Sequence, residues 1–455
     1  MSKLNVSGYR GIWGQDLNEK IAFEYGLAFA RLIKSQQPTK KCKILIGRDA
    51  RKTGPQILEA FRQAFAKEKI DFEYAGIIPT PSILLLVKKL SFDGGVMITA
   101  SHNPPEYNGM KFINNAGLFA TQDEIEKIIN LLPLQEKNQV VNLEVLPKEF
   151  ENEKYRKIHI DEILENVDIE KIKSKKFKIA HDPINSAGSV ITMELLQNLG
   201  CEVFQINENQ NGDFAHIPEP IAQNLGQLSE AVIKNKTDIG FAQDPDADRL
   251  VMVNEKGEIL NEEYTLALAI KNILQKNSKE KNAVVINMST SNISADIAKE
   301  NNAEIFRTKI GEANVVNKMK EINAIIGGEG SGGVIYPKIN TARDSLVGIA
   351  LTLELMANLN KSISEIINEF PKYFIKKDKI AFTGELNLIY EKMKKTFENA
   401  EINTLDGLRF DWNDSSWLHI RPSNTEPIIR IFCEAKSQKR IDTILEQIKL
   451  TLSEQ

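Results

Sequence analysis

The pattern that most constrains the fold is one plan of alternating segments that occurs three times along the 455 residues. Each copy has a short β-branched run, a loop rich in Gly, Asp, Asn and Ser, an amphipathic helix and a second apolar run. The copies open at residues 43–47, 177–180 and 283–287 with the runs KILIG, FKIA and AVVIN. Strand, loop, helix and strand in this order form the crossover unit of a parallel sheet. The sequence therefore predicts three related α/β domains.

Changes in composition predict the domain boundaries. The polar, charge-rich segment 131–154 follows the first copy, which gives domains at 1–154, 155–255 and 256–368. From Pro371 onward the pattern changes to apolar runs around a helix expected near 387–400, with a last helix ending the chain. The sequence predicts that residues 369–455 form a smaller domain of α+β type.

Charge and hydropathy exclude several classes of protein. The chain has 58 Lys and Arg against 62 Asp and Glu, a net charge of −4, so we expect no nucleic-acid or anionic-membrane partner. The first residues lack an apolar signal core, and the densest apolar run, 83–87, is far shorter than the ~20 residues of a membrane span. Cys42, Cys201 and Cys433 are isolated, which favours buried thiols over metal ligands. We therefore expect a cytoplasmic, globular protein.

The loop TASHNPPEYNGMKF follows the apolar run VMIT and holds the first candidate site. The two prolines after Asn103 end the strand, which places Ser101 at a corner between strand and loop. A hydroxyl held there can act as a nucleophile or carry a phosphate, with Lys111 just beyond it. Taken alone, the loop is more often an ordinary turn stabilised by its serine.

The loop GFAQDPDADRLVMV carries three carboxylates, Asp244, Asp246 and Asp248. In an extended segment with a fixed φ at Pro245, these side chains point to one side. Carboxylate oxygens suit Mg²⁺, and three uncompensated charges between two apolar runs would be costly, so metal binding is favoured over a solvated turn. The EF-hand spacing is absent.

Two further loops offer polar groups for a ligand. In IIGGEGSGGVIYP, five glycines surround Glu329 and Ser331, and the glutamate can accept hydrogen bonds from two neighbouring hydroxyls. A tight turn between strands is the simpler interpretation of this loop. In HIRPSNTEPIIRIFCEA, a guanidinium, two hydroxyls and an amide can form a phosphate cradle, although a plain turn remains the alternative. These cradle residues are Arg421, Ser423, Asn424 and Thr425.

In this order and at these spacings, the four loops resemble the α-D-phosphohexomutase family, the group of phosphoglucomutases, phosphomannomutases and phosphoglucosamine mutases. TASHNPPEYNGMKF resembles the phosphoserine loop of the family, DPDADR its metal loop, GGEGSGG its sugar loop and RPSNTEP its phosphate loop. The resemblance covers nearly the whole chain. It implies three related α/β domains with mixed sheets, and a C-terminal α+β domain, around one central cleft.

The resemblance also implies roles for individual residues. The catalytic group would be Ser101 as the phosphorylated residue with Arg10, Lys111 and His102. The Mg²⁺ ligands would be Ser101, Asp244, Asp246 and Asp248. The substrate contacts would be Glu329, Ser331, Arg421, Ser423, Asn424, Thr425, Arg249 and Gly311. A hexose 1,6-bisphosphate would act as intermediate and activator, hexose phosphates would be the small-molecule partners, and the protein would be a monomer or homodimer.

One position departs from the family pattern. The sugar loop has Gly333 where many bacterial relatives carry a histidine, so the residue that acts as general acid and base there stays open.

The expected reaction interconverts hexose 1-phosphate and 6-phosphate, with glucosamine or mannose phosphates favoured as substrates. Glucose phosphate is an alternative substrate. A metal-dependent sugar phosphatase and a catalytically silent sugar-phosphate binder are the competing functions.

Overall fold

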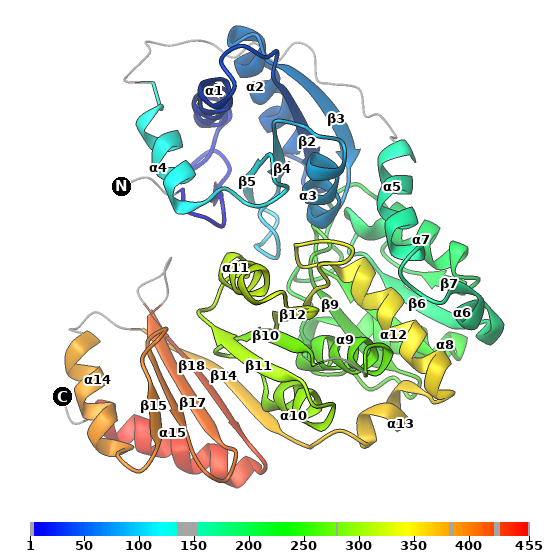
Figure 1. Cartoon of the computed structure of the whole chain (residues 1–455), viewed down its shortest axis with the longest axis vertical. Coiled ribbons are helices and arrows are strands. Elements are labelled where there is room, and N and C mark those ends of the chain that lie inside the picture. The colour runs from blue at the N-terminus through cyan, green and yellow to red at the C-terminus, as the bar shows by residue number, and fades with distance from the viewer. Residues whose placement is uncertain (1–3, 134–152, 279–280, 382–385, 423–427, 454–455) are drawn as a thin grey trace. The chain divides into compact units, whose positions relative to one another are not determined.

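The computed structural model describes residues 4–133, 153–278, 281–381, 386–422 and 428–453 (Figure 1). Contacts within the chain divide it into two compact units. Unit 1 comprises Met1–Thr265 and Gly332–Ser364, and unit 2 comprises Leu266–Ser331 and Glu365–Gln455. Across the described ranges, every helix is too short or too polar to span a lipid bilayer.

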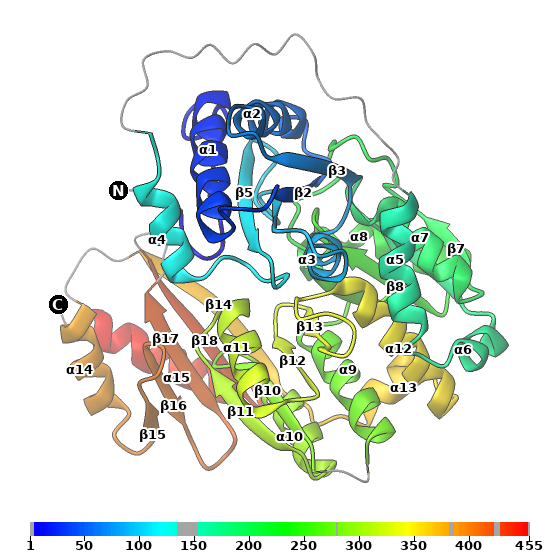
Figure 2. The same cartoon turned by 45° about the horizontal axis from the view of Figure 1, so that its top comes forward.

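The first sheet of unit 1 has five strands in the order β1-β5-β4-β2-β3. Strands β4, β2 and the edge strand β3 are parallel, and β5 is antiparallel to both β4 and β1. Alternate residues of β2 face opposite sides of the sheet: Ile44 and Ile46 belong to a core with residues of α1 and α2, and Leu45 belongs to a core with residues of α3. Figure 2 shows α1 and α2 on one side of this sheet and α3 on the other. The elements are β1 (Tyr9–Ile12), α1 (Glu19–Gln36), β2 (Lys43–Arg48), α2 (Gly54–Lys67), β3 (Asp71–Ile77), α3 (Thr80–Lys89), β4 (Gly94–Ile98), β5 (Tyr107–Asn114) and α4 (Gln122–Asn130).

Two helices of this part, α1 and α4, begin at side-chain caps. The Asn18 side chain accepts a hydrogen bond from the backbone of Ile21 at the start of α1, and Thr121 and Glu124 form a capping box at α4. Pro55 stands in the first turn of α2, where no intrahelical donor is needed. These local signals fix where the chain leaves each loop and enters a helix.

The second sheet of unit 1 has the order β7-β6-β8-β9, with β6 parallel to β7 and β8, and β9 antiparallel to β8. Its elements are α5 (Glu153–Leu164), α6 (Ile169–Lys175), β6 (Lys178–Asp182), α7 (Gly188–Asn198), β7 (Glu202–Gln205), η1 (Ala222–Asn224), α8 (Gly226–Asn235), β8 (Ile239–Gln243) and β9 (Leu250–Asn254). Unit 1 also holds β13 (Gly333–Ile335) and α12 (Ser345–Leu359). Helices α9 (Glu263–Lys276) and α13 (Ile363–Asn368) begin in the residues of unit 1 and end in those of unit 2.

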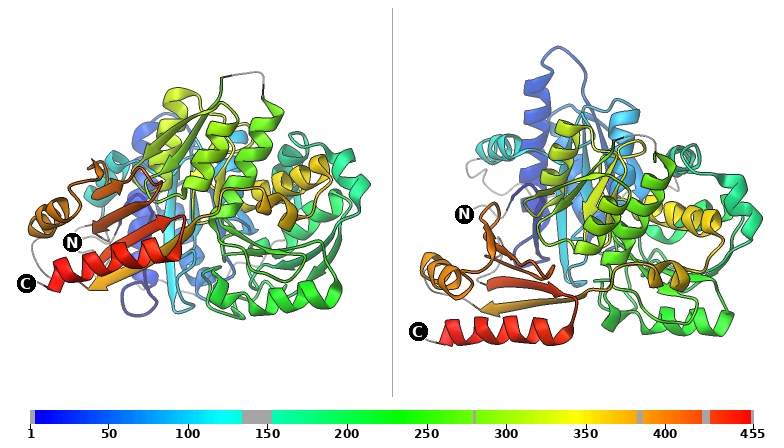
Figure 3. Two further views of the ribbon diagram at one scale, coloured as in Figure 1. Left: turned by 90° about the horizontal axis from the view of Figure 1, so that it is seen from below. Right: turned by 60° about the horizontal axis from the view of Figure 1, so that its bottom comes forward.

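Unit 2 repeats the parallel plan once and then changes to an antiparallel one. Strand β10 (Ala283–Asn287) lies between β11 (Glu304–Thr308) and β12 (Ile326–Glu329), parallel to both, and the crossover helices are α10 (Asn292–Glu300) and α11 (Glu312–Ile322). The C-terminal sheet is antiparallel with the order β14-β18-β17-β16-β15, and α15 runs along one of its faces (Figure 3). Its elements are β14 (Phe374–Ala381), α14 (Leu386–Thr396), β15 (Glu401–Asn403), β16 (Leu408–Asp411), β17 (Trp417–Pro422), β18 (Ile428–Ala435) and α15 (Gln438–Ser453).

The repeated plan predicted from the sequence is confirmed. In all three copies the first strand lies between its two parallel neighbours, and helices make the crossover connections. The C-terminal part is α+β, as expected, but α14 ends at Thr396 instead of 400, because Phe397 leaves the helix to pack on Phe410 and Trp412. Much of the polar segment 131–154 falls outside the described residues, and the four domain boundaries stay predictions.

The cysteines are placed as isolated thiols. Cys42 and Cys433 are buried, Cys201 is half-buried, and all three are free. Burial raises the pKa of Cys201 and of Cys433 to about 12, so both remain protonated and unreactive at neutral pH.

Candidate functional site

Ser101 lies three residues after β4, at the corner that the sequence predicted. Its backbone adopts the left-handed conformation with φ of 51°, which is uncommon for a residue other than glycine. The side chain is buried, and its Oγ donates a hydrogen bond of 3.0 Å to Oδ2 of Asp244. The ring nitrogen Nδ1 of His102 lies 3.3 Å from the same Oγ. The strained loop therefore presents this hydroxyl to an acidic group on one side and an imidazole on the other.

Arg51 holds the Ser101 loop in place, and sequence reasoning missed it. Its guanidinium, only 1% exposed, donates to the backbone carbonyl oxygens of Ser101, Asn103, Pro104 and Tyr107 at 2.6–2.9 Å. Nε of Arg51 also donates to the Asp49 carboxylate. The available signal was the RDAR string directly after the first buried strand, where two arginines flank an aspartate.

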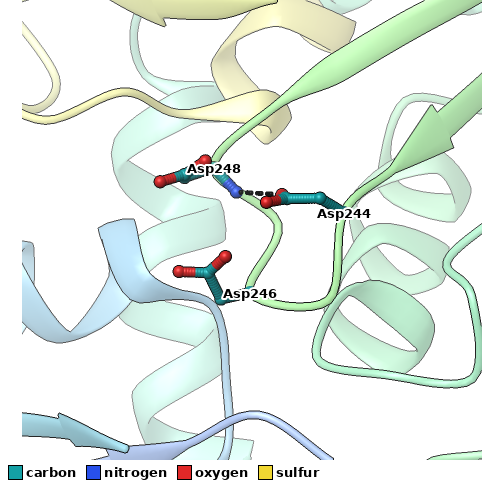
Figure 4. A group of neighbouring side chains, drawn as sticks. All are labelled: Asp244, Asp246 and Asp248. Atoms are coloured by element: carbon teal, nitrogen blue, oxygen red, sulfur yellow. Dashed lines mark hydrogen bonds between the residues drawn. The ribbon is translucent and has the colours of Figure 1, made fainter. Parts of the chain in front are cut away.

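The three aspartates of the second loop converge in the turn between β8 and β9. One carboxylate oxygen from each of Asp244, Asp246 and Asp248 lies within 4.8 Å of the other two, and all three residues are buried (Figure 4). The segment is a turn and not the extended chain expected from the sequence. Ala247 takes a left-handed φ of 52°, and Oδ1 of Asp244 accepts a hydrogen bond from the backbone nitrogen of Asp248. This fold-back brings the carboxylates closer than an extended segment would allow.

One cation and one hydroxyl compensate part of the carboxylate charge. Nζ of Lys111, on β5, lies 2.7 Å from Oδ2 of Asp246, and the hydroxyl of Thr80 donates to the same oxygen. Although burial acts to raise it, the pKa of Asp246 is held below its usual range by the charge of Lys111 and by these hydrogen bonds. Burial, followed by the charges of Asp248 and Asp246, raises the pKa of Asp244 well above its usual range.

The aspartate cluster fits a divalent cation. Oδ1 of Asp246 and Oδ1 of Asp248 are buried, and no hydrogen-bond donor reaches either atom. Buried carboxylate oxygens without a donor are costly, and a hard cation is the group that satisfies them. Burial, and after it the negative charges of Asp248 and Asp246, raise the pKa of Asp244, and a cation would offset both effects. Within the described ranges, this is the acidic cluster with metal-ligand geometry.

Arginine side chains surround the Ser101 loop. Arg10, on β1, donates 3.0 Å from Nη1 to the Asn103 side chain. The backbone nitrogen of Arg249 donates to Oδ1 of Asp244, and its Nε lies 3.9 Å from Oδ1 of Asp248. The charge of Arg249, then burial and the charge of Arg10, lower the pKa of His102 well below its usual value. His102 is therefore neutral near pH 7, next to the Ser101 hydroxyl.

Unit 2 brings two of the predicted sugar contacts together. Glu329 ends β12, and its Oε1 accepts hydrogen bonds of 2.9 Å from the backbone nitrogen of Gly311 and from the Asn287 side chain. Gly311 has a φ of 118°, a conformation that favours glycine, and it precedes α11. Ser331 lies in the turn after Glu329 and is partly exposed. The glutamate is thus fixed through one oxygen.

The predicted phosphate cradle is described in part. Arg421 lies in β17, and its Nε is 3.4 Å from Oδ1 of Asp406, while Oδ2 of Asp406 accepts a hydrogen bond from the backbone nitrogen of Ile310. Asp406 was not singled out from the sequence, and it links Arg421 to the loop that carries Gly311. The other three cradle residues lie outside the described part of the chain: Ser423, Asn424 and Thr425.

Three related α/β folds, an antiparallel C-terminal sheet and a buried serine beside an acidic triad define an enzyme of the phosphotransferase type. Models of four phosphoglucomutase/phosphomannomutase domains match the chain: alpha/beta/alpha domain I at 1–139, domain II at 157–257, domain III at 261–374 and the C-terminal domain at 385–451. The chain belongs to the phosphoglucomutase/phosphomannomutase family, and it is a phosphohexomutase, an isomerase.

Relatives match over the full length. A "Phosphoglucomutase/phosphomannomutase" of Thermococcus kodakarensis is 36% identical over 98% of this chain and 97% of its own. A "Phosphoglucosamine/phosphogalactosamine mutase" of Sulfurisphaera tokodaii is 32% identical over 99% of both chains. Among solved structures, a family protein of Burkholderia thailandensis superposes with a TM-score of 0.84 at 24% identity, covering 99% of this chain and 97% of that one, which shows the shared fold.

Proposed function

We propose that this phosphohexomutase interconverts the 1- and 6-phosphates of glucosamine or mannose through a phosphoserine at Ser101. The observation that carries the assignment of Ser101 is its hydrogen bond to Asp244 within the acidic triad. For the substrate, the support is that full-length relatives of Methanococcus vannielii and Methanocaldococcus jannaschii, each 33% identical, are named phosphoglucosamine mutase. The name of the Thermococcus kodakarensis relative supports mannose and glucose phosphates.

Each residue has a task in the proposed reaction. Phospho-Ser101 transfers its phosphoryl group to the free hydroxyl of a hexose monophosphate, and the hydroxyl proton leaves to a nearby base. The P–O bond to Oγ breaks as the new P–O bond forms, which gives a hexose 1,6-bisphosphate and a serine oxygen that needs a proton. After the bisphosphate turns over in the site, its other phosphoryl group returns to Oγ. His102 is neutral and 3.3 Å from Oγ, which suits it to exchange that proton.

The charges around Ser101 support phosphoryl transfer. Transfer of this group depends on positioning and on stabilising negative charge. Asp244, Asp246 and Asp248 would hold Mg²⁺ together with an oxygen of Ser101 or its phosphate, and the ion would neutralise charge on the transferring group. Lys111 and Arg10 supply fixed positive charge from β5 and β1. Glu329 and Arg421 would bind the sugar hydroxyls and the phosphate that does not react.

The test is an incubation with Mg²⁺, a hexose 1-phosphate and a trace of the 1,6-bisphosphate. The proposal predicts isomerised sugar phosphate without release of inorganic phosphate. Free phosphate would instead favour the phosphatase alternative, and absence of both would favour a silent binder. The substrates to be compared in this assay are the 1-phosphates of glucosamine, mannose, glucose and N-acetylglucosamine.

A Ser101→Ala variant is the matched control for the proposed phosphoserine. It should lose turnover by orders of magnitude and lack a phosphopeptide that covers the loop. An alanine variant with the wild-type rate would refute the phosphoserine route.

Four further expectations stay predictions: the cytoplasmic location, the lack of nucleic-acid and membrane partners, the bisphosphate activator and the monomeric or dimeric state.

A further inference from the structure

The side chain of Arg343 occupies the space next to Gly333. A Cβ atom built on Gly333 would lie 2.3 Å from Cδ and 2.8 Å from Cγ of Arg343, distances at which one of the two must move. In this chain any side chain at 333 would displace the aliphatic stem of Arg343.

The guanidinium of Arg343 reaches the acidic triad. Its Nη2 donates a hydrogen bond of 2.7 Å to Oδ2 of Asp248, and the Arg343 side chain is only 13% exposed. Oδ1 of Asp248 is the buried oxygen that no donor reaches. Arg343 thus engages one carboxylate oxygen and leaves the other for a cation.

Hydrogen bonds of the next residue, Asp344, hold the backbone beside Arg343 in place. Asp344 caps α12 by accepting from the backbone nitrogens of Leu346 and Val347, and its other oxygen pairs with buried His159. The backbone nitrogen of Asp344 also donates to the carbonyl of Val334 in β13. Arg343 therefore extends from a rigid helix start and does not belong to a mobile surface loop.

Three arginines share this environment. The charges of Arg249, Arg10 and Arg343 all act on His102, and the charges of Arg249 and Arg343 act on Arg10. Guanidinium groups repel one another, and the charges of Asp246 and Asp248 offset part of this repulsion at Arg10. A phosphoryl group on Ser101 would bring a charge of about −1.5 to −2 to this place.

We propose that Arg343 is a positioning residue that orients Asp248 toward the metal, and that Gly333 is glycine because the stem of Arg343 lies over it. The proposal rests on the proposed Mg²⁺ site. The guanidinium acts through the carboxylate it holds, as partners of metal ligands commonly do. The Arg343 guanidinium stays charged at every pH at which the protein is folded, whereas a histidine would lose its charge near neutral pH. Its hydrogen bond to Asp248 therefore does not depend on the protonation of Arg343.

The experiment measures Mg²⁺ affinity by calorimetry on dephosphorylated full-length protein. Arg343→Ala should weaken Mg²⁺ binding by about 10- to 100-fold, the usual cost of losing such a partner. Arg343→Lys keeps the charge with a less suitable donor and should fall in between. Arg156→Ala is the matched control, because this guanidinium pairs with Glu194 and is similarly shielded at 11% exposure, on other helices of the same unit.

A second pair of variants tests the link between the two positions. Gly333→Ala should weaken Mg²⁺ binding by displacing Arg343, whereas adding Gly333→Ala to Arg343→Ala should cost nothing further. Unchanged or tighter Mg²⁺ binding in folded Arg343→Ala would overturn the proposal, since the guanidinium would then be neutral for the metal or repel it. Additive effects of the two substitutions would also overturn it. If Asp246→Asn binds Mg²⁺ as well as wild type, the proposed metal site itself fails.

Discussion

Replacing Arg51 by alanine should loosen the loop that carries Ser101. The guanidinium donates to four backbone carbonyls of this loop and is almost fully buried, so its loss removes one donor from each of these acceptors. A hydrogen bond from a charged donor contributes about 1.5–3 kcal/mol. The four hydrogen bonds share one side chain, so their energies are not additive. We therefore estimate the loss of loop stability as the cost of removing one buried charged partner, about 3–5 kcal/mol.

Hydrogen exchange of two amides within the loop measures this cost directly. The backbone nitrogens of Asn103 and Tyr107 donate to Ala100 and Pro104, so both report opening of the loop. A loss of 3–5 kcal/mol predicts exchange faster by about 10² to 10⁴-fold in Arg51→Ala. Turnover should also fall by about 10²-fold, because a serine displaced by about 1 Å no longer meets the reacting group.

The control for Arg51→Ala is Arg156→Ala, which removes an arginine from the same unit without touching the loop. Arg156→Ala should leave the hydrogen-exchange rates of the Asn103 and Tyr107 amides unchanged. If Asn103 and Tyr107 exchange no faster in Arg51→Ala than in this control, the guanidinium does not hold the loop, and the reasoning is wrong.

Further outcomes follow from the charges at and near the site. Asp246→Asn should weaken Mg²⁺ binding by about 10- to 100-fold and lower turnover with it, and full activity in excess EDTA would contradict a metal-dependent reaction. Glu329→Gln keeps an oxygen for its two donors but loses the charge, so KM for the hexose phosphate should rise about 10-fold, and an unchanged KM would remove this residue from the sugar site. Burial lowers the pKa of His181 and of His419 to about 4, so below pH 6.5 the unfolded chain takes up protons that the folded chain does not. Denaturant unfolding should therefore show a loss of about 2 kcal/mol per histidine between pH 6.5 and 5, and His181→Asn should flatten that pH dependence.

The sequence by itself located the repeated strands and the residues that mark each candidate loop. Periodicity located the strands at 43–47, 177–180 and 283–287, because a buried parallel strand needs a continuous apolar run between breakers. It also placed Ser101 at the end of such a strand and grouped three aspartates in five residues. These features are local in the chain, so spacing alone reveals them.

Only the tertiary structure decided which distant groups meet. Arg51 and Arg343 stand 50 and 95 positions away from the residues they hold, Ser101 and Asp248, and no local pattern identifies the partner of either arginine. The turn at Ala247 also escaped sequence analysis, because a left-handed alanine is fixed by surrounding contacts against its own preference. Gly333 shows the same limit: its meaning depends on a side chain ten residues later that folds back over it. Long-range packing selects such partners, and a one-dimensional pattern carries no record of them.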